Sequence, residues 1–170
     1  KVVSIDAAAS DKVDLTEEER NLLSVDYKNV VGARRASWRT LNIEENKDNG
    51  LINTFKKQIE TELQSLCKDV LDLLESSLIP FTKGKGDEPE VFYLKMAGDY
   101  YRYLAEFVED KGYDQSAAKN YEAALVVAKE KLAPTHPIRL GLALNYSVCF
   151  YEILKDQKKA CDLAKQAFDE

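Results

Sequence analysis

A long helical pattern that opens at Thr16 sets the main limit on how this chain can fold. Thr16 with Glu19 three residues later forms a capping box, and Glu17 and Glu18 suit the positive end of a helix dipole. We expect this helix to run to about Glu45. Its apolar side chains fall on more than one side, which predicts neighbouring elements on several sides: Leu22, Leu23, Val30, Val31 and Trp38.

The rest of the chain predicts an all-α protein. Its 170 residues include only seven Gly and four Pro, and alternating strand-like runs are scarce. With 45% hydrophobic residues, a chain of this length can bury a core as one domain. We therefore expect an irregular lead-in over residues 1–14 and a single helical domain over residues 15–170.

Punctuating residues divide that domain into about six helices. A turn over Asn46–Gly50 precedes a second long helix that we expect Pro80 to end, and a surface loop over Thr82–Pro89 follows. Gly112 marks a later turn, and Thr135 is the expected cap of the fifth helix, which has Pro137 in its first turn. After the first helix we expect a second to Ile79, a third from Glu90 to about Val108, a fourth after Gly112 to about Leu132, a fifth that begins near Pro137 and a sixth from about Gln157.

Charge and cysteine usage exclude several classes of function. The formal net charge of −6 argues against nucleic acid or an anionic membrane as the main partner, and no run of about 18 apolar residues predicts a membrane span. Residues 1–10 lack the pattern of a signal peptide. Cys67, Cys149 and Cys161 are widely spaced and predict reduced thiols in a cytoplasmic protein.

The inventory of reactive side chains does not favour an enzyme, a metal site or a cofactor. His136 is the only histidine, which removes most catalytic triads and zinc sites, and its place before Pro137 predicts a structural role at a helix entrance. No glycine-rich phosphate loop of the Gly-x-x-x-x-Gly-Lys type occurs.

A basic stripe inside the first helix is unusual in such an acidic chain. At about 100° per residue, Lys28, Arg35 and Arg39 fall within roughly 20° of one line. Lys95 and Arg102 repeat the seven-residue spacing on a later helix. Such groups on facing helices would trap a doubly charged oxyanion such as phosphate; the alternative is a solvated surface or a set of structural ion pairs.

Three blocks of sequence resemble the 14-3-3 family. They are Glu18–Arg39 (EERNLLSVDYKNVVGARRASWR), Val91–Glu106 (VFYLKMAGDYYRYLAE) and Pro134–Asn145 leading into YEIL at 151–154. The resemblance covers nearly everything from Leu15 to Glu170, and it corresponds to the family's part from the end of its second helix to the start of its seventh. It implies an antiparallel helical superhelix with a concave amphipathic groove, truncated at both ends relative to the family's nine helices.

The same resemblance implies which residues bind. It assigns Lys28, Arg35, Arg102 and Tyr103 to a phosphate group, by match to the family's motif. It assigns Asn145 to the peptide backbone, although a local structural role for Asn145 stays open. The other groove residues are Leu144, Val148, Gly141, Lys95 and Glu152, and we expect Asp99 and Glu152 to hold the arginines in the free protein.

The implied function is that of a non-enzymatic adaptor that clamps phosphoserine or phosphothreonine peptides of client proteins. The resemblance also implies a homodimer, or a heterodimer with chains of the same family. One alternative is a tetratricopeptide-like helical-repeat module that binds peptides without phosphate, since helix pairs at 98–132 and 141–170 repeat loosely. Another is an enzyme acting on phosphate esters, for which the sequence offers no base or metal set.

Overall fold

A computed structural model describes residues 15–43, 48–85, 88–109 and 111–169 of the chain. Every regular element in these ranges is a helix, as the sequence predicted. The predicted lead-in over residues 1–14 lies outside the described residues, as do parts of the turn predicted at 46–50 and of the loop predicted at 82–89.

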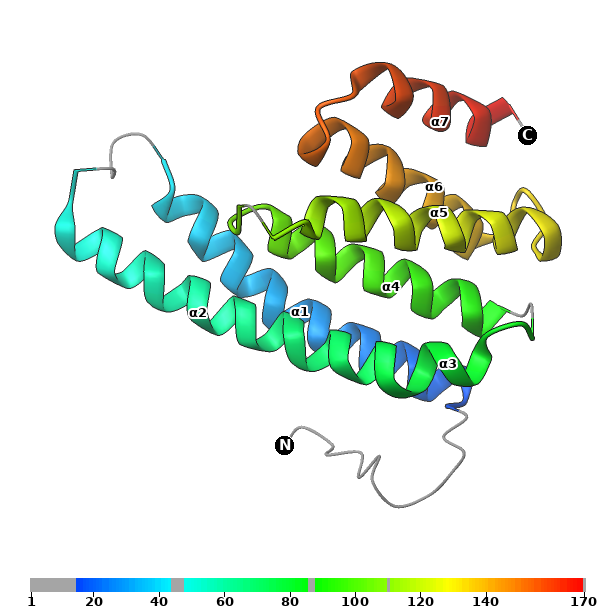
Figure 1. The fold of residues 1–170 in the computed structure, drawn as a ribbon, viewed down its shortest axis with the longest axis horizontal. Coiled ribbons are helices and arrows are strands. Elements are labelled where there is room, and N and C mark those ends of the chain that lie inside the picture. Colours follow the sequence, from blue (N-terminus) through cyan, green and yellow to red (C-terminus); the bar gives the residue numbers. More distant parts are fainter. Residues whose placement is uncertain (1–14, 44–47, 86–87, 110, 170) are drawn as a thin grey trace.

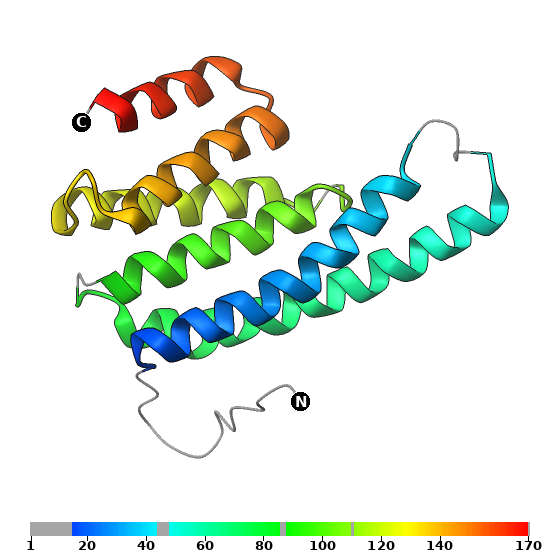
Figure 2. The ribbon, with the colours of Figure 1, turned by 180° about the vertical axis from the view of Figure 1, so that it is seen from behind.

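The helices are stacked so that each runs opposite to the one before it, and the longest pair lies at one side (Figure 1). The main elements are α1 (Glu17–Leu41), α2 (Gly50–Leu73), α4 (Glu88–Ala105), α5 (Tyr113–Lys131), α6 (Pro137–Val148) and α7 (Gln157–Asp169). α1 packs on α2, and α4, α5, α6 and α7 follow in succession. The end of the α1–α2 pair near Leu41 and Gly50 projects beyond the other helices (Figures 1 and 2).

The start of α1 confirms the predicted capping box. The Thr16 hydroxyl accepts a hydrogen bond from the Glu19 backbone N–H at 3.3 Å, and Glu19 Oε2 accepts one from the Thr16 N–H at 2.8 Å. The predicted end near Glu45 is wrong. The helix ends at Leu41, where the Asn42 N–H still bonds to the Trp38 carbonyl at 2.9 Å before the chain turns.

Pro80 does not end the second long helix, contrary to the prediction. A π-helical turn, η2 (Leu74–Leu78), follows α2 directly and leads into the short helix α3 (Ile79–Thr82). The Ile79 N–H bonds to the Leu74 carbonyl, and Pro80, which has no N–H to donate, lies in the first turn of α3. The helical path therefore continues to Thr82, and Gly84 then takes a left-handed φ of +78°.

Helix α4 lies at the centre of the core because it is buried on two opposite sides. Met96, Tyr100 and Tyr103 belong to the cluster that includes buried residues of α1 and α2, whereas Val91 and Leu94 belong to the cluster shared with α5 and α6. Figure 2 shows α1 from the side on which it runs along α4. The residues of α4 that reach α1 are consequently fixed from behind by α5.

The approach of α4 to α5 depends on a glycine. A Cβ atom at Gly98 would lie 2.8 Å from two ring carbons of Tyr121, which is closer than real carbon atoms come. The Tyr121 ring is fully buried and stacks on Tyr146, with centroids 5.5 Å apart. The absence of a side chain at Gly98 therefore lets the Tyr121 ring lie flat against the α4 backbone.

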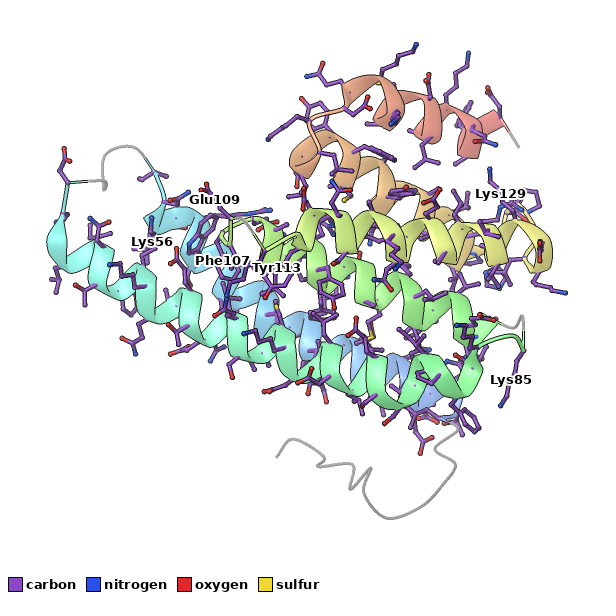
Figure 3. The ribbon with its side chains drawn as sticks, viewed as in Figure 1. Lys56, Lys85, Phe107, Glu109, Tyr113 and Lys129 are labelled. Carbon is purple, nitrogen blue, oxygen red and sulfur yellow. The ribbon has the colours of Figure 1, made fainter. Side chains whose placement is uncertain are left out.

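The turn between α4 and α5 begins three residues earlier than predicted, because α4 ends at Ala105 rather than near Val108. Phe107 packs on Trp38 of α1 and Tyr113 packs on Tyr101, each with centroids 6.0 Å apart. Figure 3 labels Phe107 and Tyr113 where this turn meets the α1–α2 pair. Gly112 has a φ of +68°, which agrees with the turn predicted there.

The start of α6 corrects another prediction, because the cap is His136 and not Thr135. The His136 ring Nδ1 accepts a hydrogen bond from the Ile138 N–H at 3.2 Å, and Pro137 occupies the first turn. The predicted structural role of His136 is thus confirmed. A π turn, η3 (Cys149–Ile153), continues α6, and α7 begins at Gln157 as expected.

Candidate functional site

Arg35 of α1 is paired with a carboxylate that follows the last turn of α4. Its guanidinium holds Glu106 through two contacts, Nη2 to Oε1 and Nε to Oε2, the latter at 3.3 Å. Arg39, one turn further along α1, donates from Nη2 to Glu106 Oε1 at 2.8 Å. The Glu106 side chain is only 9% exposed, so two arginines of the basic stripe share one largely buried carboxylate.

The Tyr103 ring brings the two predicted phosphate-binding arginines together. The central guanidinium carbon of Arg35 lies 3.8 Å from the ring centroid, and that of Arg102 lies 4.9 Å from the same centroid. Both distances are within the range of cation–π attraction. Burial raises the pKa of Tyr103, so its hydroxyl keeps its proton and remains a hydrogen-bond donor.

Lys28 lies at the rim of the same hollow. A pocket between α1 and α4 is lined by Lys28, Asn29, Gly32, Ala33, Arg35 and Tyr103. The structure therefore gathers Lys28, Arg35 and Tyr103 around one pocket, with Arg102 against the ring at its wall, although about 70 residues of sequence separate the two halves.

Arg102 is held by a network behind this pocket. Its Nε donates to the Tyr121 hydroxyl at 3.1 Å, and its Nη2 lies 3.6 Å from Asp99 Oδ1. Burial alone would lower the pKa of Arg102, but the contacts with Tyr121 and Asp99 outweigh it and raise that pKa above its ordinary value. Arg102 is therefore charged at any physiological pH while its side chain is only 8% exposed.

Asn145 and Lys95 belong to the same network. Asp99 Oδ1 accepts a hydrogen bond from Asn145 Nδ2 at 2.8 Å, and Lys95 Nζ donates to Asp99 Oδ2 at 2.9 Å. The Lys95 side chain also lies close to Gly141: a Cβ atom added to Gly141 would be 3.7 Å from Lys95 Cε. The Asp99 carboxylate therefore links Arg102 with predicted groove residues of both α4 and α6.

The apolar groove candidates lie further along α6. Leu144 is 62% exposed, and Val148 is partly buried. A large apolar side chain left in solvent at Leu144 is consistent with a contact surface, but nothing in the contacts of the free chain assigns a ligand to it.

Glu152 does not take the role predicted for it. Glu106, rather than Glu152, pairs with Arg35, while Asp99 contacts Arg102 as expected. Glu152 is exposed and lines a second pocket between α1, α4 and η3, together with Trp38, Arg39, Ala105, Glu106, Ile153 and Lys155. The helical spacing that suggested Glu152 concerns only its own helical segment, α6 with η3, and gives no information on its distance from α1.

Glu106 and Tyr121 are the network residues that the sequence did not reveal. Glu106 lies four residues after Arg102 and three after Tyr103, so its helical spacing alone could have placed it on the same face. Tyr121 follows Arg102 by 19 residues on another helix, and no local pattern connects the two.

Two other kinds of site are absent from the described part of the chain. No group of three or more His, Cys, Asp or Glu side chains there could hold a metal ion. No helix within the same residues is long and apolar enough to cross a membrane.

Fold and pocket together define a class: an all-helical protein of successive antiparallel helices that presents a cationic pocket between α1 and α4. Comparison with known proteins then identifies the family. A family model described as "14-3-3 protein" matches residues 1–170, and the chain belongs to the 14-3-3 family. Members of this family are adaptor and regulatory proteins of signal transduction.

Relatives from distant organisms give the same result. The chain is 54% identical to the 14-3-3-like protein GF14-12 of Zea mays over 96% of its length and 66% of the relative's. It is 52% identical to 14-3-3 protein beta/alpha-A of Xenopus laevis over 92% of this chain and 67% of the relative. It is also 52% identical to the checkpoint signal transducer rad24 of Schizosaccharomyces pombe over 99% of this chain and 66% of the relative. The chain thus spans about two thirds of the length of these curated relatives.

Proposed function

We propose that this chain is the phosphopeptide-binding part of an adaptor that clamps phosphoserine- or phosphothreonine-containing segments of client proteins. The observation that carries the proposal is the convergence of Arg35 and Arg102 on the Tyr103 ring, with Lys28 at the rim of the same pocket. Two planar guanidinium groups suit bidentate bonding to phosphate oxygens, and Lys28 adds a point charge. Recognition of phosphorylated motifs by arginine clusters is an established mode of peptide binding, of which 14-3-3 proteins are themselves an example.

Carboxylates of the chain itself pair with both arginines of the free pocket, and this gives the proposal a physical mechanism. Glu106 pairs with Arg35 and Asp99 contacts Arg102, so both guanidinium groups stay oriented before a ligand arrives. A phosphate dianion would add negative charge where two arginines and Lys28 supply a surplus of positive charge. Preorientation reduces the entropy that binding must overcome.

The residues beyond the phosphate would hold the rest of the peptide. We propose that Asn145 bonds the peptide backbone, that Lys95, Gly141 and Glu152 border the peptide's path, and that Leu144 and Val148 contact its apolar side chains. Binding, and not catalysis, would be the activity, and the adaptor would act by masking or reshaping its client. We also propose that it pairs with a second chain of the same family, which would let two pockets hold two phosphosites of one client and raise the apparent affinity by about 10²–10⁴.

A titration of a fluorescent peptide with and without phosphoserine tests the proposal. Arg35→Ala or Arg102→Ala should weaken binding of the phosphorylated peptide by about 2–4 kcal/mol, because each removes a charge-assisted pair with the anion. The lysine variants should recover only part of this loss, since the planar fork is missing. Equal binding of both peptides would contradict the phosphate assignment and favour a phosphate-independent peptide-binding module.

Arg34→Ala is the matched control. Arg34 is next to Arg35 in sequence but pairs with Glu62 of α2 at 3.1 Å, where both side chains are at least 40% exposed. Its loss should leave phosphopeptide affinity within about twofold, because it removes an equal charge outside the pocket. A loss as large as that of Arg35→Ala would mean that net charge alone drives binding.

A further inference from the structure

We propose that Tyr121 is a positioning residue of the phosphate pocket, whose buried hydroxyl fixes the Arg102 guanidinium so that its terminal nitrogens face the anion. This inference rests on the proposed function, because it concerns how the same pocket is held ready. Neither Tyr121 nor Arg102 is among the residues that line the pocket, but Arg102 contacts the Tyr103 ring that does, and Tyr121 would act only through Arg102.

The Tyr121 hydroxyl is directional because both of its hydrogen-bonding roles are taken. It donates its single proton to Asp99 Oδ1 at 2.5 Å and accepts a hydrogen bond from Arg102 Nε at 3.1 Å. Burial and the nearby Asp99 carboxylate raise the pKa of Tyr121, which keeps the hydroxyl protonated. The proton therefore always points at Asp99, and a lone pair is always available to Arg102.

The ring that carries this hydroxyl has little room to move. One face lies on the α4 backbone at Gly98, and Tyr146 stacks on the ring with an interplanar angle of 28°. Tyr121 has no exposed surface. The position of its oxygen is thus determined by the packing of α4 against α5, and α5 supplies a fixed reference point for an arginine of α4.

The hydrogen bond from Arg102 Nε to Tyr121 leaves the two terminal Nη atoms of Arg102 available for a ligand. Neither Nη atom donates a hydrogen bond to a described residue; Nη2 only lies 3.6 Å from Asp99. The Arg102 side chain as a whole is 8% exposed, so it is not completely removed from solvent. An arginine bound at Nε and stacked beside Tyr103 presents these two nitrogens together, as bidentate recognition of an oxyanion requires.

The same carboxylate oxygen extends the network to the proposed peptide contact. Asp99 Oδ1 accepts from Tyr121 and also from Asn145 Nδ2 at 2.8 Å. Side chains of α4, α5 and α6 therefore meet at one atom, and the orientation of Arg102 is fixed relative to Asn145.

The test is a double-mutant cycle with Tyr121→Phe, which removes only the hydroxyl and keeps the ring that packs on Gly98. We expect Tyr121→Phe to weaken phosphopeptide binding about tenfold, since Arg102 loses its fixed orientation. In the Arg102→Lys background, where no Nε–H exists, the same substitution should change affinity by less than about twofold. Tyr146→Phe is the matched control, because it removes a hydroxyl from the neighbouring ring of the same stack, and we expect wild-type affinity.

A second measurement needs no peptide. The Arg102 Nε–H resonance in a ¹⁵N spectrum should exchange slowly with water in the wild type and in Tyr146→Phe, and about tenfold faster or more in Tyr121→Phe. Wild-type affinity of a folded Tyr121→Phe variant, an equal loss in the Arg102→Lys background, or unchanged exchange at Nε would each overturn the inference. If the wild type does not prefer the phosphorylated peptide, the proposed function fails instead, and the exchange measurement still decides whether Tyr121 holds Arg102.

Discussion

Among single residues, the pocket is determined by which carboxylate each arginine meets. Arg35 and Arg39 share Glu106, whereas Arg34, which directly precedes Arg35 in the sequence, pairs with Glu62 of α2. The Glu106 side chain is 9% exposed and that of Glu62 is 45% exposed. Burial of this kind makes the loss of one partner costly, because the other charge remains poorly solvated.

Glu106→Gln should therefore destabilise the folded chain by about 1–3 kcal/mol, since it leaves two arginines without their shared carboxylate. Glu62→Gln is the control and should cost less than about 1 kcal/mol, because the Arg34 pair is solvent-exposed. Urea unfolding at neutral pH gives both values. Equal effects of the two substitutions would show that the Glu106 pairs contribute no more than a surface ion pair.

Among the helices, α4 serves as the template for the site because neighbours cover it on both sides. Its close contact with α5 at Gly98 positions Tyr121, and its last turn carries Arg102 and Tyr103. The capped start of α6 in turn positions Asn145 beside Asp99. Substitutions at Gly98 and at the α6 cap test these contacts separately.

Gly98→Ala should destabilise the chain by about 1–2 kcal/mol. The added Cβ would lie 2.8 Å from the immobile Tyr121 ring, and such overpacking outweighs the roughly 1 kcal/mol gain in helix propensity. Gly32→Ala on α1 is the control, because nothing lies within 4 Å of its Cβ, and it should raise stability by up to about 1 kcal/mol. A Gly98→Ala chain as stable as Gly32→Ala would mean that α4 and α5 separate at little cost.

His136→Ala should lower stability by about 1 kcal/mol through loss of the α6 cap. His136→Asn should restore most of this loss, because an asparagine side chain accepts the same type of backbone hydrogen bond. Thr135→Ala should have almost no effect, since Thr135 is exposed and does not cap the helix. Thermal melts of the three variants compare them, and an asparagine variant as unstable as the alanine variant would contradict the capping role.

In the molecule as a whole, the core encloses groups that ionise in alkali. Burial raises the pKa of the Cys67 thiol to about 12 and that of Cys149 to about 11, from an ordinary value of 9.0. Between pH 9.0 and these raised values, both thiols stay protonated in the folded chain but are ionised in the unfolded chain. Stability from this source is therefore complete below about pH 9 and is lost as the pH rises toward the folded values.

Raising the pH from 8 to 10 should cost about 1.4 kcal/mol of folding free energy through Cys67 alone. Cys67→Ala should be less stable than the wild type at pH 8, because it leaves a cavity, but its further loss between pH 8 and 10 should be smaller by about this amount. Urea unfolding with a reductant at both pH values measures the difference. The same loss in both proteins would contradict ionisation of Cys67 as its cause.

Features that depend on local geometry could be predicted from the amino-acid sequence alone. Helical periodicity and few Gly and Pro predicted the all-α class, and the Thr16–Glu19 box predicted the start of α1, because these act within one or two turns. The residue set Lys28, Arg35, Arg102 and Tyr103 came from a stripe of basic residues and from family resemblance. The structure places Lys28, Arg35 and Tyr103 around one pocket, with Arg102 against the Tyr103 ring. That these residues bind phosphate stays a prediction.

Features that depend on contacts between helices could be learned only from the folded chain. Glu106 rather than Glu152 meets Arg35, and Tyr121 meets Arg102, because the packing of α4 against α1 and α5 sets those distances. Two local features were also left open by the sequence: Pro80 lies in a helical path that continues through a π turn, and the His136 ring, rather than the Thr135 side chain, accepts the bond from the Ile138 N–H. Each outcome required a choice among several acceptable local conformations, and only the burial of neighbouring surfaces makes that choice.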